Sequence, residues 1–187
     1  EKGLVEVKNP SELFLAERQN DITGSTIFPS LEGTRPILVE VQALVSNANF
    51  GTPQRNVNGF DFKRLAMLLA VLEKRIGTHM GTKDVFINLV GGLKIDDPAA
   101  DLAVISAVAS SSRDKIIKES VVLIGEVGLG GEVRSVSRLK ERINEAKSLG
   151  FKSVIAPAAN LKRMKDRIKG VDITGVTNVG EVFHHLF

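Results

Sequence analysis

The chain contains few residues that could bind a metal ion or react as a thiol. Cysteine is absent, which excludes disulfides, thiolate nucleophiles and cysteine-based zinc sites. The three histidines are His79, His184 and His185, and two of them are adjacent, so neither a His triad nor a HExxH zinc motif can be assembled. We therefore expect no metal site in this chain.

A glycine-rich stretch, Gly128-Leu129-Gly130-Gly131, could suggest a phosphate-binding loop. It does not have the GxGxxG pattern, no helix is expected to start directly on it, and the chain contains no GxxxxGK[ST] motif. We interpret this stretch as a tight turn between two strands.

Three short motifs follow one another in the second half of the chain. They are Asp97-Pro98-Ala99-Ala100, then Gly125-Glu126-Val127-x-Leu129-x-Gly131-x-Val133, then Leu139-Lys140-Glu141-Arg142 ahead of Val154-Ile155-Ala156-Pro157. In this order they resemble the proteolytic domain of Lon peptidases, best over residues 84–187 and without a gap from Ala99 to Arg142. The resemblance implies a mixed α/β fold (α+β layers) of the Lon proteolytic-domain type, which is also seen in domain 2 of ribosomal protein S5.

Lon peptidases use a Ser-Lys dyad, in which a lysine of lowered pKa takes the proton from a serine nucleophile. The resemblance places the nucleophile at Ala99, the general base at Arg142 and a supporting threonine at Ile124. Alanine has no hydroxyl, and a guanidinium with a pKa above ~12 cannot act as a base near neutral pH. We therefore expect a pseudo-protease with no catalytic residue.

Neighbouring residues offer no obvious substitute for this dyad. Lys140 lies two residues before Arg142, about 200° around the expected helix, so it points elsewhere. Four serines belong to a central helix and its end, and we interpret them as caps or packing residues: Ser106, Ser110, Ser111 and Ser112.

Further segments lie mainly in the first half of the chain. They are Gly3-Leu4-Val5-Glu6-Val7-x-Asn9-Pro10-Ser11-Glu12-Leu13-Phe14-Leu15, Glu32-Gly33-Thr34-Arg35-Pro36, Leu65-Ala66-Met67-Leu68-Leu69-Ala70-Val71-Leu72 and Asp84-Val85-Phe86-x-Asn88-x-Val90-Gly91-Gly92. Together with the earlier motifs, they resemble the C-terminal region of the RadA (Sms) family of bacterial recombination and repair proteins, over essentially the whole chain.

The RadA resemblance implies partners and cofactors beyond this chain. It implies a homohexameric ring that acts on branched DNA intermediates alongside recombination proteins such as RecA. It also implies a RecA-like ATPase and a zinc finger upstream, so ATP, Mg and Zn are expected only in those parts and no cofactor in this domain. Because the first residue is Glu1 rather than Met, we expect the chain to be a piece of a longer protein.

Length and composition suit one domain over residues 1–187, with residues 1–35 as an N-terminal extension or loop region. Apolar residues make up 43% of the 187, which is enough for a core. No apolar run approaches the ~20 residues that span a bilayer, and no signal-peptide pattern is present. We expect a cytoplasmic protein without a membrane partner.

The hydrophobic pattern predicts alternating strands and helices in the second half. Helices are expected at 61–75, 99–110, 137–149, 159–169 and 179–187, and strands at 37–45, 84–90, 121–124, 151–156 and 171–176. Residues 20–35 and 46–60 are expected to be loops because they are rich in Gly, Pro and polar residues. Asp61 and Asp97 are expected to cap the helices that follow them, the latter with Pro98 at the first helical position.

Charge is unevenly distributed along the chain. Residues 1–50 hold four basic and seven acidic residues, whereas residues 51–83 hold six basic and two acidic residues. A basic surface of this kind is typical of phosphate binding, and the absence of Trp and Tyr argues against a single-strand stacking platform. We therefore expect contacts with duplex or branched DNA from Arg55, Lys63, Arg64, Lys74, Arg75, Arg113 and Lys115. A rival basic face comprises Lys162, Arg163, Lys165, Arg167 and Lys169.

Three functions remain open on the sequence alone. The preferred one is a noncatalytic domain that binds DNA and supports ring assembly of an ATP-driven motor in DNA repair. A second is a scaffold for assembly only, in which the basic residues solvate the surface or pair with acidic neighbours. A third is a Lon-like Ser-Lys peptidase, against which Ala99 and Arg142 argue directly.

Overall fold

A seven-stranded mixed sheet organises the part of the chain that the structure describes. The structure is a computed structural model that describes residues 10–15, 17–19, 21–49, 51–118, 120–164 and 168–187. The strand order is β3-β4-β2-β1-β5-β8-β9. The bounds are β1 Ser25–Glu32, β2 Arg35–Asn47, β3 Arg55–Asn58, β4 Lys83–Leu89, β5 Val121–Leu123, β8 Ser153–Pro157 and β9 Asp172–Val176.

The relative direction of neighbouring strands changes across this sheet. The pairs β1–β2 and β2–β4 are antiparallel, whereas β3–β4, β1–β5, β5–β8 and β8–β9 are parallel. A separate antiparallel hairpin is formed by β6 (Glu126–Val127) and β7 (Val133–Arg134), joined by the glycine-rich turn. The prediction of a tight turn between two strands is therefore confirmed.

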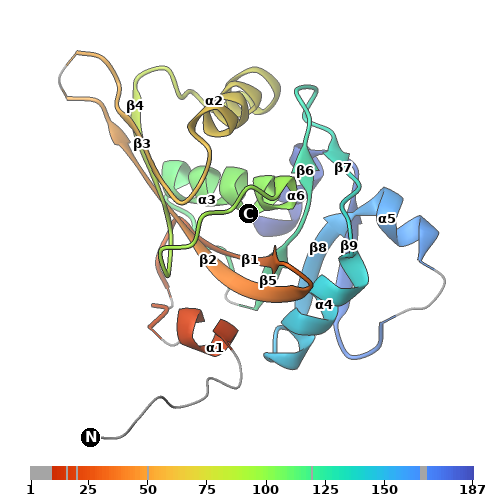
Figure 1. Ribbon diagram of the computed structural model, residues 1–187. Coiled ribbons are helices and arrows are strands. Elements are labelled where there is room, and N and C mark those ends of the chain that lie inside the picture. The colour runs from red at the N-terminus through yellow and green to blue at the C-terminus, as the bar shows by residue number, and fades with distance from the viewer. Residues whose placement is uncertain (1–9, 16, 20, 50, 119, 165–167) are drawn as a thin grey trace, which may run out of the picture.

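Helices cover the sheet in layers (Figure 1). Helix α3 packs on β1 and β2, α2 packs on α3, and α1 contacts β2 from the opposite side of the sheet. The bounds are α1 Pro10–Leu15, α2 Phe62–Val71, α3 Asp101–Arg113, α4 Leu139–Ser148, α5 Ala158–Arg163 and α6 Val179–Leu186, with a π-helical turn η1 at Leu72–Ile76 and a 3-10 turn η2 at Pro98–Ala100. The expected mixed α/β class is confirmed.

The central helix α3 is buried along most of its length. Its first ten residues are all buried, as its small and apolar composition predicts. Helix α2 buries Leu65, Leu68 and Leu69 on one side, which confirms the predicted apolar face. The carboxylate of Asp61 accepts a hydrogen bond from the amide of Arg64 at 2.7 Å, which confirms the predicted cap. In the described part of the chain, no helix has both the length and the apolar character needed to cross a bilayer.

Two predicted loops contain strands. Within 20–35, β1 is buried because its polar side chains find partners: Ser25 donates to Glu40 at 2.6 Å and Thr26 donates to the carbonyl of Ala103 at 3.0 Å. Within 46–60, the short strand β3 pairs with β4. Tertiary hydrogen bonds therefore overrode the local preference of Ser, Thr, Asn and Pro for loops.

The predicted helix at 159–169 is also corrected. Helix α5 ends at Arg163, and Met164 has extended backbone angles (φ −74°, ψ 119°). Lys165 and Arg167 of the rival basic face lie outside the described residues, whereas Lys162, Arg163 and Lys169 are exposed.

Candidate functional site

One carboxylate joins the two positions that the sequence matched to the Lon dyad. Asp97 is the N-cap of η2, and its Oδ1 accepts a hydrogen bond from the amide of Ala99 at 3.0 Å, as predicted. Its Oδ2 accepts a hydrogen bond from Nη2 of Arg142 at 2.6 Å. The carboxylate of Asp97 therefore joins the backbone of Ala99 to the side chain of Arg142.

Arg142 is completely buried, and its guanidinium is surrounded by acceptors. Nη1 donates to the carbonyl of Pro29 at 2.6 Å and Nε donates to the carbonyl of Ser137 at 3.0 Å. The guanidinium carbon lies 5.6 Å from the centroid of the Phe28 ring. Burial lowers the pKa of Arg142, and the attraction of Asp97 opposes that shift. An arginine starts from so high a pKa that it stays charged at neutral pH, so this group holds structure and accepts no proton.

The rest of the predicted dyad site is packed with apolar groups. Ala99 is 1% exposed and Ile124 is fully buried, so the methyl group of Ala99 is closed to a substrate. Ile143 and Ala146, next to Arg142 on α4, are also buried, whereas Lys140 points to the exposed side of the helix, as predicted. The hydrogen bond from Arg142 to Asp97 and the apolar packing around it can hold the N-terminal end of α3 against α4.

The central serines have structural partners. Ser110 donates to the carbonyl of Lys115 at 2.5 Å and accepts from the amide of Gly24 at 2.8 Å. Ser111 accepts from the amide of Val45 at 2.9 Å. For these two residues the predicted capping and packing role is confirmed. Ser106 is fully buried, and its Oγ has no hydrogen-bond partner within the described chain.

A second Asp–Arg pair, between α2 and α3, was missed by sequence reasoning. Asp101 is fully buried and accepts two hydrogen bonds from Arg64, through Nε and Nη2, and a third from the amide of Val127 at 2.9 Å. Burial raises the pKa of Asp101, and the hydrogen bonds from Arg64 and Val127 oppose that rise. The bond to Asp101 raises the pKa of Arg64, despite partial burial. A signal was present in the sequence, since Asp101 is the lone acid in an otherwise small and apolar helix.

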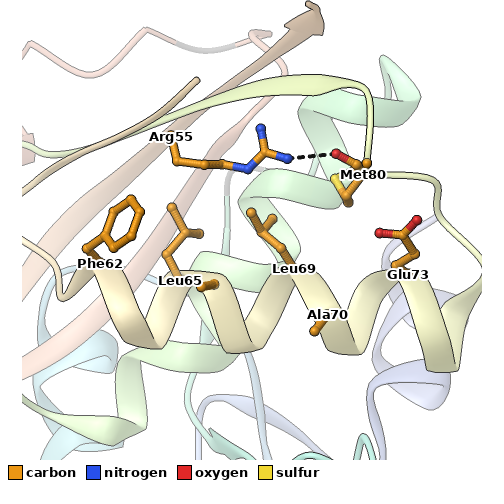
Figure 2. Close-up of a pocket in the computed structure, with 9 residues that line it drawn as sticks. Arg55, Phe62, Leu65, Leu69, Ala70, Glu73 and Met80 are labelled. Atoms are coloured by element: carbon orange, nitrogen blue, oxygen red, sulfur yellow. Dashed lines mark hydrogen bonds between the residues drawn. The ribbon is translucent and has the colours of Figure 1, made fainter. Parts of the chain in front are cut away.

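Two of the expected DNA contacts are therefore occupied within the chain. Arg64 is held by Asp101, and Oε1 of Glu126 lies 3.9 Å from Nη2 of Arg64. Arg55 is held by backbone carbonyls. It donates to Met80 at 2.8 Å (Figure 2). It also donates to Gln54 at 3.0 Å and to Lys83. The expected DNA-binding surface therefore excludes the guanidinium groups of Arg55 and Arg64.

The other five expected contacts are exposed. Lys63 and Lys74 lie on α2 and η1, and Lys115 follows α3. Arg75 donates from Nε to the carbonyl of Leu129 at 3.3 Å. Arg113 stacks over two rings of α6 and its end, with its guanidinium carbon 4.9 Å from the Phe183 centroid. Lys63, Lys74 and Lys115 are thus exposed lysines, whereas the exposed Arg75 and Arg113 contact neighbouring groups of the chain.

Comparison with known proteins identifies the family to which the chain is similar. Residues 72–187 match the family of the Lon protease (S16) C-terminal proteolytic domain. The chain is similar to "DNA repair protein RadA" from Bacillus subtilis (strain 168), with 51% identity over 97% of the chain and 39% of the relative. Similar relatives carry the same name in Listeria monocytogenes serovar 1/2a (48% identity; 96% of the chain, 39% of the relative) and Streptococcus pyogenes serotype M1 (46%; 99% and 41%).

The match covers nearly the whole chain but only part of each relative. The chain spans about two fifths of the length of these RadA proteins. The family match covers the elements from η1 to α6, which include Ala99, Ile124 and Arg142. The chain therefore belongs to the family of the Lon protease (S16) C-terminal proteolytic domain, in the Lon-like form found in the RadA proteins.

Proposed function

We propose that this chain is a noncatalytic Lon-like domain that binds duplex or branched DNA and supports ring assembly in a DNA repair protein. The observation that carries the proposal is the buried Arg142, whose donors are engaged by Asp97, Pro29 and Ser137. A site built this way has neither a nucleophile nor a proton acceptor where Lon places them. The name that the relatives share, "DNA repair protein RadA", supports the repair role.

Loss of peptidase chemistry follows from the residues at the dyad positions. A methyl group at Ala99 cannot attack a carbonyl, and Arg142 is already protonated. Installing only the hydroxyl, by Ala99→Ser, leaves Arg142 unable to take the proton. We therefore expect no turnover of casein or of a fluorogenic peptide by the parent chain or by Ala99→Ser. Turnover by the parent that a serine-directed reagent abolishes would favour the peptidase alternative.

DNA binding rests on the exposed cations Lys63, Lys74 and Lys115. Phosphate contacts need lysine or arginine on an accessible face and need no aromatic stacking. Lys63 and Lys74 lie eleven residues apart on one continuous helical segment, about 16 Å along its axis, so each can reach a different phosphate. Arg75 and Arg113 add two further exposed positive charges.

The assembly role and the remaining partners rest on the relationship to RadA. We place the homohexameric ring and action alongside recombination proteins such as RecA in the full-length protein. ATP, Mg and Zn belong, in this proposal, to the parts of the relatives that lie outside the region matched by this chain. This domain supplies a surface for DNA and contacts between neighbouring copies.

A salt-dependent DNA titration of the full-length protein tests the binding half of the proposal. The parent should lose affinity steeply as salt rises, for duplex and branched substrates of different sequence alike. DNA binding that is independent of the cations of this domain, in a protein that still assembles, would favour the scaffold-only alternative. A monomer at working concentration, with and without nucleotide and DNA, would contradict the assembly half.

A further inference from the structure

Arg113 is the last residue of helix α3, and its backbone is held in place by the end of that helix. The amide of Asp114 donates to the carbonyls of Ser110 and Ser111, which closes α3 immediately after Arg113. Asp114 takes left-handed backbone angles there (φ 51°, ψ 44°), as is common where a helix ends. The Arg113 side chain therefore leaves the fold from a defined point.

Two phenylalanine rings hold the Arg113 side chain. Its guanidinium carbon lies 4.9 Å from the centroid of Phe183 and 5.4 Å from the centroid of Phe187, both within the range of a cation–π interaction. The rings lie one helical turn apart because the amide of Phe187 donates to the carbonyl of Phe183 at 3.0 Å, and they meet edge to face. Phe183 is only 4% exposed, so the core fixes one ring and the end of α6 fixes the other.

This arrangement fixes an arginine without neutralising it. Arg64 and Arg142 are held by carboxylates, whereas Arg113 is held by uncharged rings. In the described part of the chain, no carboxylate lies within ion-pair distance of Arg113, that of the neighbouring Asp114 included. Its hydrogen bond within that part is a long one, from Nη2 to the hydroxyl of Thr78 at 3.5 Å. Among the described residues, Nε and Nη1 thus have no acceptor and can donate to an anion from outside.

The contact with Thr78 places Arg113 near other exposed cations. Thr78 follows Gly77, the residue that ends η1, and η1 carries Lys74. Lys115 lies two residues after Arg113 and is also exposed. A planar guanidinium accompanied by lysines suits a phosphate group, because phosphate oxygens accept several N–H bonds at once.

We propose that Arg113 contacts a phosphate of the bound DNA and that Phe183 and Phe187 are positioning residues for this contact. The inference rests on the proposed DNA binding of the domain, and it gives α6 a part in that binding. The rings hold the guanidinium in place before DNA arrives, so less side-chain freedom is lost when the contact forms. Because the rings are uncharged, they leave the positive charge of Arg113 to the phosphate.

Paired substitutions in the full-length protein test the positioning role by DNA titration over a salt series. Arg113→Ala should weaken duplex binding about tenfold and flatten the salt slope by about one unit, because one phosphate contact is lost. Phe187→Leu removes a ring but keeps apolar bulk, and it should weaken binding about threefold. The double variant should bind as Arg113→Ala does, since the ring acts through the arginine. Phe187→Tyr keeps an aromatic face and should bind as the parent does.

The matched control for the lost ring is Phe151→Leu. Phe151 is also half-buried, and among the described residues its ring contacts no cation. This control should leave DNA affinity unchanged. Urea unfolding of each variant verifies that the fold persists, so that a change in affinity reports the contact rather than loss of structure.

Two results would show that the rings do not position a phosphate contact. One is a loss of affinity on Phe187→Leu that is equally large with and without Arg113, which indicates a purely structural ring. The other is parent-like affinity of either Phe187→Leu or Arg113→Ala. If Arg113→Ala binds normally while joint replacement of Lys63 and Lys74 by alanine weakens binding, the Arg113 contact is refuted and the proposed function stands. A parent protein that binds no DNA refutes both.

Discussion

Two groups of basic side chains in this fold have opposite roles. At the N-terminal end of α3, the buried Arg142 is paired with Asp97 and the partly exposed Arg64 is paired with Asp101. On the outer surface of α2 and η1, Lys63 and Lys74 are exposed to solvent. The first group holds helices together, and the second is available to a partner. The two groups differ both in their position relative to the core and in residue type.

The comparison also explains the use of arginine inside and lysine outside. A guanidinium can satisfy several acceptors in fixed directions, as Arg142 does with Asp97, Pro29 and Ser137. Lysine is a flexible point charge that suits phosphate contacts without fixed geometry. Replacing either kind should therefore affect a different property of the protein.

Arg142→Ala should have the largest effect on stability. It leaves the Asp97 carboxylate without its partner and opens a cavity beside Phe28, so the free energy of unfolding should fall by about 3–5 kcal/mol. Urea unfolding measures the change. A matched control is Lys147→Ala, an exposed residue of the same helix, which should shift the free energy of unfolding by only about 0.5 kcal/mol. Similar values for the two variants would break the division into structural and available cations.

Arg64→Ala should have the next largest effect, and it should depend on pH. The loss at neutral pH should be about 2 kcal/mol, less than for Arg142 because Arg64 is 27% exposed and the amide of Val127 remains on Asp101. Burial already raises the pKa of Asp101, and removal of Arg64 should raise that pKa further. Lys63→Ala, one residue away and exposed, is the matched control.

The sign of this pH dependence follows from proton binding. With a raised pKa, folded Asp101 binds a proton at pH values where the unfolded chain, with a pKa of about 3.9, does not. The free energy of unfolding of Arg64→Ala should therefore fall as pH rises from the unfolded pKa through the folded one. A deficit that is the same at acid and neutral pH would show that Asp101 is not the group left unpaired.

Sequence reasoning predicted the fold class correctly but did not identify the partners of the buried charges. Helix periodicity located α2, and capping chemistry identified Asp61 and Asp97, because these signals lie within a few residues. The pairs Asp97–Arg142 and Arg64–Asp101 join residues far apart in the chain. Local sequence patterns do not show which distant residues pair with each other. Arg64 was therefore assigned to the DNA-binding surface, whereas it pairs with Asp101 of α3.

Strand β1 shows the same limit for backbone structure. Its sequence, with Ser25, Thr26, Pro29 and Ser30, suggests a loop. In the folded chain the two strands beside it, β2 and β5, supply backbone pairing, and Glu40 and Ala103 accept its buried hydroxyls. A polar segment can thus enter the core when distant residues supply acceptors, and only the three-dimensional structure reveals them.

Lys63→Ala combined with Lys74→Ala should change DNA binding rather than stability. Removing each lysine–phosphate interaction should flatten the slope of affinity against salt by about one unit, on all DNA sequences alike. The free energy of unfolding should change by only about 0.5 kcal/mol for each substitution. Lys162→Ala combined with Arg163→Ala, on α5, is the matched control. Impaired binding by the α5 variant alone would move the DNA surface to the rival face.

The smallest expected effect belongs to Glu181, a charge that is exposed yet structural. It lies in the first turn of α6 and accepts hydrogen bonds from the amide and hydroxyl of Thr177 at 2.7 and 2.8 Å, while Asn178 caps its own amide. The bond from the Thr177 amide, above all, lowers the pKa of Glu181. Its contribution to stability is therefore present above the unfolded pKa of about 4.3 and is lost as pH falls through the lower folded value.

Glu181→Gln tests this intermediate case because it keeps the shape and removes the charge. The parent should be slightly more stable than the variant at neutral pH, and the two unfolding free energies should converge as the pH falls below the usual range of a glutamate. Amide exchange in the first turn of α6 should show the same convergence. A difference that persists in acid would mean that the charge plays no part in the cap. In that case, exposure alone would distinguish charges available to a partner from charges that stabilise the fold. If the two unfolding free energies converge in acid, the hydrogen-bond partners of a charge are the better criterion.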